Sequence, residues 1–433
     1  MDISTIIMFL GFILAAYSVV GNDVIQTLGT FLAANEKRPW WVLFLFAGSI
    51  LTVTVLYGWA FTKPERVAQD QGFSAINGTS YYVEYTEAKS SLSDGALVYK
   101  SVFKKLAEKL AEEGDSVLAS IPFSNIQLYT KNGDTFQKAV MAEARVSGAF
   151  TLDLRQNGQT TQHTIVTKRV HEVSYNRLEK FDYPEDIQWW FLLPPIILLI
   201  ITRFGIPVST TFLILSFFTP KNMSSMLLKS LSGYVLAFLV AILLYLAIAK
   251  ILEAKFHRVE LERNSKETRN WTIVQWLSTA FLWSMWLVQD FANIYVYLPR
   301  DLSFGTLLFS LVVILAMLAY IFYTRGGAIQ EIVTAKTNTS DIRSAAIINF
   351  IYGAVLLFFK EWSNLPMSTT WVFLGLLAGR EYALRARLFR KVDWSLHKMV
   401  LSDLGKATIG IVVSILLVVA IYWLRGQDVA SLF

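Results

Sequence analysis

Two short polar runs interrupt apolar segments of this chain in almost the same way. Each places a proline two residues before a Ser-Thr-Thr sequence, first at residues 207–211 and again at residues 366–370. Inside a bilayer such a break leaves backbone N–H and C=O groups without partners, so it is tolerated only where protein encloses it. Broken helices that recur in two halves of a chain are typical of secondary transporters. The repetition therefore favours a membrane protein built from two related halves.

The composition agrees that most of the chain lies in a membrane. Of the 433 residues, 54% are hydrophobic and 14% are aromatic, and the mean hydropathy is +0.45. A soluble domain of this size is less apolar. The absence of cysteine excludes disulfides and thiolate metal sites. The net charge of +6 is modest and is typical of basic cytoplasmic loops, so we expect no nucleic-acid partner. No nucleotide-binding loop or metal-ligand cluster is visible, and we expect no enzymatic activity.

A series of apolar segments accounts for the membrane part. They cover about 4–34, 40–61, 189–218, 226–250, 272–298, 303–324, 342–378 and 403–424. Because one crossing needs about 20 apolar residues, we interpret each proline-broken segment as a re-entrant helical hairpin, the second at about 345–379. The fold class is therefore an all-α polytopic membrane protein of two repeats, each with three spans and one hairpin. Since three is odd, the second repeat is inverted relative to the first.

The distribution of Lys and Arg supports this topology. With hairpins that do not cross, most basic loop residues fall on one face, and little beyond Lys221, Arg300 and Arg425 falls on the other. Cytoplasmic loops carry the excess of Lys and Arg, so the first face is predicted to be cytoplasmic. We therefore expect a multi-pass protein of the plasma or inner membrane with both termini outside the cytoplasm.

Residues 62–188 break the apolar pattern. They are polar, with the alternation and Asn-Gly turns typical of strands, and one amphipathic helix is predicted at about 97–113. We interpret them as a soluble α+β domain that is inserted on the extracytoplasmic side. The predicted divisions are spans 1 and 2 of the first repeat at 1–61, the inserted domain at 62–188, the hairpin and last span of the first repeat at 189–254, and the second repeat at 255–433.

Each half also carries an acidic motif inside an apolar segment. Asp23 and Asp290 each cost several kcal/mol in lipid unless they are paired, and no Lys or Arg lies nearby in sequence. Two amides at i, i+4 spacing accompany each carboxylate, and amide oxygens are hard ligands that suit Na⁺. The predicted Na⁺ ligands are Asn22, Asp23, Gln26, Gln289, Asp290 and Asn293. The alternative is that the two carboxylates lie near the water interface or cap a broken helix.

The two hydroxyl runs predict helix N-termini. Ser or Thr after a proline caps free backbone N–H groups. The same N–H groups and the positive end of the helix dipole attract anions. Two such termini that face each other near the midplane could hold a tetrahedral oxyanion without any Lys or Arg. The alternative is plain capping of a kinked helix.

These motifs together resemble those of the inorganic phosphate transporter (PiT) family. Residues 21–30 are similar to the family signature Gly-Ala-Asn-Asp-Val-Ala-Asn-Ala-Phe-Gly-Thr, and residues 289–293 to its second copy. Residues 207–211 and 366–370 are similar to its Pro-Val-Ser-Thr-Thr-His segments. By this resemblance the chain is identified as a divergent member, with residues 62–188 as an inserted extracytoplasmic domain.

The resemblance implies a symporter in which Na⁺ or H⁺ drives the uptake of inorganic phosphate, with sulfate or another oxyanion as the alternative substrate. It implies no cofactor beyond the coupling ion, and family members are often homodimers. It implies cation ligands at Asp23 and Asp290, with Asn22 and Asn293 matching family amides. Asp23 or Asp290 could also accept a hydrogen bond from a bound phosphate. The implied anion contacts are Ser209, Thr210, Thr211, Ser368, Thr369 and Thr370.

A rival interpretation is a non-transporting sensor or receptor with a transporter-like core. Its motivation is the replacement of the family histidine after each Ser-Thr-Thr by Phe212 and Trp371. The retained aspartates argue against it, because an unused carboxylate in lipid carries a cost without a function.

Overall fold

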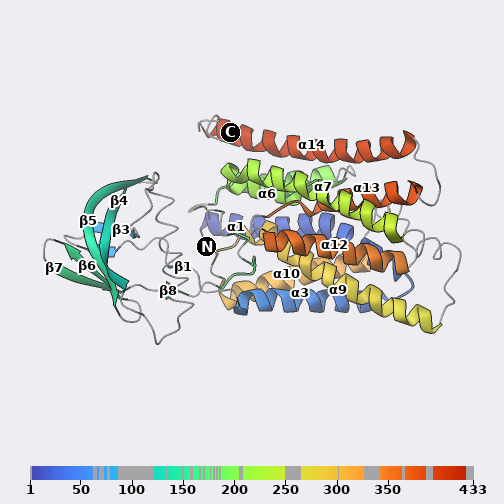
Figure 1. The fold of residues 1–433 in the computed structure, drawn as a ribbon, viewed down its shortest axis with the longest axis horizontal. Helices are drawn as coiled ribbons and strands as arrows, with labels where there is room; N and C mark the ends of the chain where they lie inside the picture. The colour runs from blue at the N-terminus through green and yellow to red at the C-terminus, as the bar shows by residue number, and fades with distance from the viewer. Residues whose placement is uncertain are drawn as a thin grey trace. The chain divides into compact units, whose positions relative to one another are not determined.

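A computed structural model shows two compact units, one formed by Met1–Phe61 with His171–Phe433 and the other by Thr62–Val170. The described residues are 2–61, 66–67, 73–75, 79–85, 121–132, 135–147, 151–156, 159–164, 167–168, 171–175, 177–178, 181, 184, 187–203, 208–248, 265–300, 302–325, 342–362, 366–386 and 394–425. Figure 1 shows the helices of the first unit lying roughly parallel or antiparallel to one another.

The first half of the helical unit starts with a helix that is interrupted at the acidic motif. α1 (Ile3–Val19) passes into the π-helical turn η1 (Val20–Val24) and continues as α2 (Ile25–Ala34). A π-helical turn of this kind is common at functional sites. The elements that follow are α3 (Trp40–Phe61), η2 (Trp189–Leu192), α5 (Leu193–Arg203), α6 (Thr210–Phe218), η3 (Pro220–Asn222) and α7 (Met223–Ile248).

The second half repeats this order of elements. It contains α9 (Lys266–Tyr295), α10 (Phe304–Tyr323), α12 (Ile342–Trp362), α13 (Thr369–Leu384) and α14 (Trp394–Leu424). Among the described residues, six helical stretches are long and apolar enough to cross a membrane: Ile3–Val24, Trp40–Phe61, Pro220–Ala247, Phe304–Tyr323, Ile342–Trp362 and Trp394–Leu424. The prediction of a helical, multi-pass membrane protein is confirmed.

Contacts show that the two acidic-motif helices run in opposite directions. At the end of α2, Asn35 Nδ2 donates to Gln275 Oε1, near the start of α9, over 3.1 Å. In α1, the ring of Phe12 packs 5.9 Å from the ring of Tyr295, at the end of α9. The N-terminal end of each helix therefore lies beside the C-terminal end of the other.

Both proline-broken segments return to the end of the bundle from which they start. In the first, Phe191 of η2 packs against Phe217 at the end of α6, with ring centroids 5.4 Å apart. In the second, the ring of Tyr352 in α12 lies 5.8 Å from that of Phe373, and its hydroxyl donates to Thr369 O, so α13 runs back along α12. α12 has 21 residues and is as long as a full span. The break at Pro366 instead predicts a re-entrant hairpin at about 345–379.

Each last helix of one half packs against the hairpin of the other half. α7 packs along α13, and α14 packs against α6. The approach of α7 to α13 depends on Gly375 and Gly379, where an added Cβ would meet the backbone carbonyls of Tyr234 and Phe238. Small residues spaced by four allow helices in a membrane to approach closely.

The second unit is built around an antiparallel sheet in which sequential strands are neighbours. The strand order β2-β3-β4-β5-β6-β7 comprises Phe73–Ala75, Thr79–Tyr85, Ile121–Asn132, Thr135–Ser147, Thr151–Gln156 and Gln159–Thr164. A separate pair joins β1 (Arg66–Val67) to β8 (Thr167–Lys168). The helix predicted at 97–113 lies outside the described residues.

The boundary of this unit differs from the one expected. It ends at Val170 rather than at residue 188, and the segment from His171 onward belongs to the helical unit. Val173, Leu178 and Phe181 are 1–3% exposed there. These apolar residues are scattered among polar ones, so the sequence shows no composition change at 170.

The chain leaves and re-enters the helical unit at one point. Near the end of α3, the carbonyl of Trp59 lies 3.0 Å from His171 Nδ1, and the two rings stack with centroids 4.4 Å apart. Trp59 Nε1 also donates to Leu302 O, just before α10, over 2.9 Å. Insertions are tolerated where the two ends of a loop are this close.

We expect replacement of residues 62–170 by a Gly/Ser linker to leave the helical unit folded. A linker of about six residues reaches about 20 Å, which is ample for ends that already touch. Size-exclusion chromatography in detergent should give one symmetric peak, and the melting temperature should change by only a few degrees. Aggregation of this variant would show that the second unit is needed for the bundle to form.

Candidate functional site

Most of the predicted site residues meet in one buried cluster between η1, α6, α9 and α13. It contains Asn22, Asp23, Ser209, Thr210, Thr211, Asp290, Asn293, Ser368, Thr369 and Thr370, each at most 4% exposed. Gln289 is also buried, but its Nε2 donates to the carbonyl of Leu356 on α12. Gln26 lies in α2, and its side chain is outside the described part of the structure. Acidic and hydroxyl groups from both halves of the chain thus share one site.

The hydroxyl runs begin helices, as their sequence predicts. Ser209 Oγ accepts a hydrogen bond from the backbone N–H of Phe212 over 3.1 Å, and so caps α6. Ser368 Oγ accepts one from the N–H of Trp371 over 3.3 Å, and so caps α13. The first N–H groups of each helix have no partner inside the helix and point out of its end.

The N-termini of α6 and α13 contact each other reciprocally. Thr211 Oγ1 donates to the carbonyl of Met367 over 3.2 Å, and Thr370 Oγ1 donates to the carbonyl of Val208 over 3.3 Å. Each threonine thus reaches the residue that precedes the capping serine of the other helix. The positive ends of two helix dipoles therefore lie next to each other.

Asp23 lies beside α6 and accepts hydrogen bonds on both oxygens. Its Oδ1 accepts from Asn22 Nδ2 over 2.8 Å, and its Oδ2 accepts from Thr210 Oγ1 over 2.6 Å. Asn22 Nδ2 also approaches Val208 O at 3.4 Å. The π-helical turn η1 carries both Asn22 and Asp23, and it aims the carboxylate at the first turn of α6.

Asn293 links Asp290 to the same helix terminus. Its Nδ2 donates to Asp290 Oδ1 over 2.7 Å and lies 3.0 Å from Thr211 Oγ1 and 3.3 Å from Thr210 Oγ1. Thr211 Oγ1 lies 3.4 Å from Asp290 Oδ1, but its single proton is better placed for Met367 O. A chain of hydrogen bonds therefore connects Asp23 to Asp290 through Thr210 and Asn293.

Three oxygen atoms of the predicted cation ligands on α9 are buried without a hydrogen-bond partner among the described residues. They are Gln289 Oε1, Asp290 Oδ2 and Asn293 Oδ1, from two adjacent residues and a third about one turn later. An unsatisfied buried acceptor costs about 1–3 kcal/mol. All three are hard oxygen donors, the type that Na⁺ prefers. By donor type alone, these oxygens are compatible with a hard monovalent cation.

Arg177 is a buried basic residue of the helical unit that the sequence analysis did not single out. It is 1% exposed and belongs to the segment that was expected in the inserted domain. Burial lowers the pKa of Arg177 to about 10, and the carboxyl groups of Asp290 and Glu361 oppose that shift. No periodicity or motif around residue 177 marks it, because its environment comes from contacts distant in sequence.

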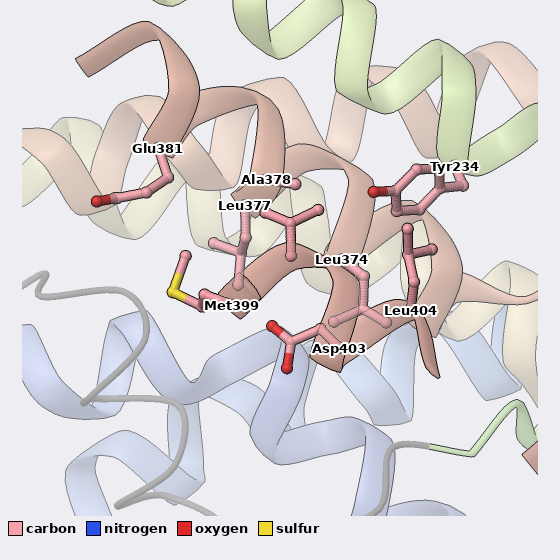
Figure 2. Close-up of a pocket in the computed structure, with 9 residues that line it drawn as sticks. Tyr234, Leu374, Leu377, Ala378, Glu381, Met399, Asp403 and Leu404 are labelled. Atoms are coloured by element: carbon pink, nitrogen blue, oxygen red, sulfur yellow. The ribbon is translucent and has the colours of Figure 1, made fainter. Parts of the chain in front are cut away.

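A separate pocket lies between α7, α13 and α14 and contains none of the predicted site residues. Figure 2 shows Leu377 and Ala378 near its middle, with Glu381, Tyr234 and Asp403 around them. Asp403 is an acidic residue of α14 that lines this pocket and is not among the predicted site residues.

Comparison with known proteins shows the fold. No protein-family profile and no curated protein sequence matches the chain. Among solved structures it is similar to one described as "The sodium-dependent phosphate transporter", with a TM-score of 0.53 and 14% identity, over 98% of this chain and 99% of that one. At this identity the likeness shows a shared fold, and the membrane fold that the resemblance implies is confirmed.

Proposed function

We propose that this protein is a secondary-active symporter that takes up inorganic phosphate together with Na⁺. The observation that carries the proposal is the reciprocal contact of two helix N-termini beside two buried carboxylates. The name of the protein with the similar fold supports this choice of anion and coupling ion. Ser209, Thr210, Thr211, Ser368, Thr369 and Thr370 would contact the anion.

The coupling follows from the charges at the site. The dipoles of α6 and α13 attract an oxyanion, but the carboxylates of Asp23 and Asp290 repel it. A Na⁺ ion held by Gln289, Asp290 and Asn293 would neutralise part of that repulsion. Each of these side chains has an oxygen with no hydrogen-bond partner among the described residues. The anion then binds well only after the cation, and transport of one requires the other. Asn22, Asp23 and Gln26 form the corresponding group in the first half.

The two halves act as inverted repeats in this proposal. Two observations support a pseudo-twofold relation between the halves. α1–α2 and α9 run in opposite directions, and the threonine contacts of α6 and α13 are reciprocal. The site would lie near the bilayer midplane, where the axis passes. Because its side chains are at most 4% exposed, one repeat must move against the other to admit the ions.

The membrane orientation is part of the same proposal. The ends of the bundle at Asn35 and at the start of α9 carry Lys37, Arg38, Lys266 and Arg269, and we place that face in the cytoplasm. Both termini and the second unit would then lie outside.

Uptake of radiolabelled phosphate by proteoliposomes tests the proposal. An inward Na⁺ gradient should raise phosphate accumulation severalfold over an equal K⁺ gradient, and excess unlabelled phosphate should compete. Competition by sulfate instead would change the substrate but keep the mechanism, while accumulation driven only by a proton gradient would change the coupling ion. Accumulation of neither anion under any gradient would contradict transport and favour the sensor interpretation.

A further inference from the structure

A row of uncharged polar side chains runs through the interface of α2, α9 and α12. It consists of Thr30, Asn35, Gln275, Thr279 and Asn349, each at most 4% exposed, and is called the polar file below. An interface of membrane helices can be packed with apolar residues alone, so five buried polar side chains in one row require a physical account.

The polar file is continuously hydrogen-bonded. Asn35 Nδ2 donates to Gln275 Oε1 over 3.1 Å, and Gln275 Nε2 donates to Thr279 Oγ1 over 3.4 Å. Asn349 Nδ2 donates to Thr279 Oγ1 over 2.8 Å, and Thr30 Oγ1 donates to Asn349 Oδ1 over 2.6 Å. The bonds cross between three helices, so they hold these helices together.

One end of the polar file reaches the candidate site. On α12, Tyr352 lies one turn beyond Asn349, and its hydroxyl donates to the carbonyl of Thr369 in the first turn of α13 over 3.0 Å. On α2, Thr27 lies between Thr30 and Asp23 on the same helix face, and its hydroxyl donates to Asp23 O over 2.9 Å. Polar groups thus continue from the polar file toward Asp23 and toward the first turn of α13.

The other end reaches solvent. Asn35 Oδ1 accepts from Arg38 Nε over 3.1 Å and from Trp276 Nε1 over 3.2 Å. The guanidinium of Arg38, which is exposed, lies over the ring of Trp276 at 5.3 Å. From Asp23 to Asn35 the helix rises about 18 Å, so the row spans the distance from the buried site to the end of the bundle.

We propose that the polar file is the closed inner route of the transporter, through which the bound ions leave toward the face of Asn35 and Arg38. This inference rests on the proposed function. Amides and hydroxyls both donate and accept, so they can replace part of the hydration shell of a cation and of an oxyanion. When α2 separates from α9 and α12, the groups that bond to one another in the closed state become free to contact the ions and water.

The absence of cysteine makes the native chain a ready background for accessibility labelling. We would reconstitute Thr279→Cys and Asn349→Cys and treat them with a membrane-impermeant methanethiosulfonate cation. Ile348→Cys is the matched control, because Ile348 is 1% exposed, neighbours Asn349 on α12 and lies outside the polar file. Lys37→Cys, on the loop after α2, reports which face the reagent reaches.

During Na⁺-driven phosphate uptake, we expect the reagent to modify T279C and N349C at least about tenfold faster than I348C. The reagent should reach them from the same face of the membrane from which it modifies K37C. Uptake by both variants should fall as they are modified. If both react no faster than I348C while the wild type accumulates phosphate, the polar file only packs the helices, and the inference is overturned although the proposed function stands. If the wild type accumulates neither phosphate nor sulfate, both fall.

A second variant keeps the test informative if the cysteine variants fold poorly. Thr279→Val preserves shape and removes the hydroxyl that joins Gln275 to Asn349. We expect about a tenfold lower maximal uptake rate with an unchanged KM for phosphate, because the route and not the site is altered. An unchanged maximal rate in a well-folded T279V protein would count against the route.

Discussion

Asp290→Asn is expected to abolish Na⁺-driven phosphate uptake, lowering its rate by about 100-fold or more, because a neutral amide cannot balance the charge of Na⁺. The substitution keeps the shape of the side chain, and the carbonyl oxygen can still accept from Asn293. It also removes a buried charge, so the protein should remain folded with an undiminished melting temperature. Asp23→Asn should behave in the same way.

Binding can be measured apart from transport in the same variant. A ligand at about 100 times its Kd stabilises the folded state by about 2.7 kcal/mol. We therefore expect Na⁺ to raise the melting temperature of the wild type in detergent, and to have no effect beyond that of K⁺ on Asp290→Asn. The matched control is Asp403→Asn, which alters an acidic residue in the separate pocket of Figure 2 and should retain both uptake and the Na⁺ effect.

The control decides how a loss is interpreted. Uptake at the wild-type rate in Asp290→Asn would remove this residue from the site. Equal loss of uptake in Asp403→Asn would show that any change to a membrane carboxyl group disturbs the protein, and the assignment to one cation site would lose its support.

Gly375→Ala is expected to destabilise the helical unit by overpacking the interface between α7 and α13. The added Cβ would meet the carbonyl of Tyr234, and at Gly379 it would meet that of Phe238. A backbone carbonyl cannot rotate away as a side chain can, so α7 and α13 must move apart. Overpacking of this kind costs about 1–3 kcal/mol, which should lower the melting temperature by several degrees and reduce the yield of monodisperse protein.

Gly405→Ala is the matched control for this prediction. Gly405 also lies in a membrane helix, but an added Cβ would meet no atom within 4 Å. Alanine favours helix over glycine by about 1 kcal/mol, so this variant should be as stable as the wild type or slightly more stable. Equal stability of all three proteins would mean that α7 and α13 do not pack closely in the membrane.

Much of the candidate site could be predicted from residues that are close in sequence. Proline followed by Ser-Thr-Thr predicts a helix start, and Ser209 and Ser368 do cap α6 and α13. Carboxylates inside apolar segments indicate a buried polar site, and Asp23 and Asp290 are 1% and 0% exposed. Both inferences depend on free-energy costs of single residues or single turns, namely unpaired backbone N–H groups and a charge in lipid. These costs do not depend on which other segments pack nearby.

The polar file and the extent of the second unit could not be predicted in this way. Thr30, Gln275 and Asn349 lie in three separate apolar segments, and no pattern in the sequence shows that these segments bring them together. The segment that contains Arg177 is similar in composition to the polar domain that precedes it, so the sequence shows no boundary between them. The burial of these residues depends on which helices pack together, and hydropathy along the chain does not report it.

Local sequence patterns predict that the chain enters a membrane, where its helices break and which residue types are buried at the breaks, because hydrophobicity and capping act over a few residues. Which atoms contact one another depends instead on how the helices pack. Thr210 and Asp23 are 187 residues apart, yet their oxygens lie within 2.6 Å. Such a contact depends on how whole helices pack, and that packing depends on all of their interfaces together. A short stretch of sequence therefore does not predict it.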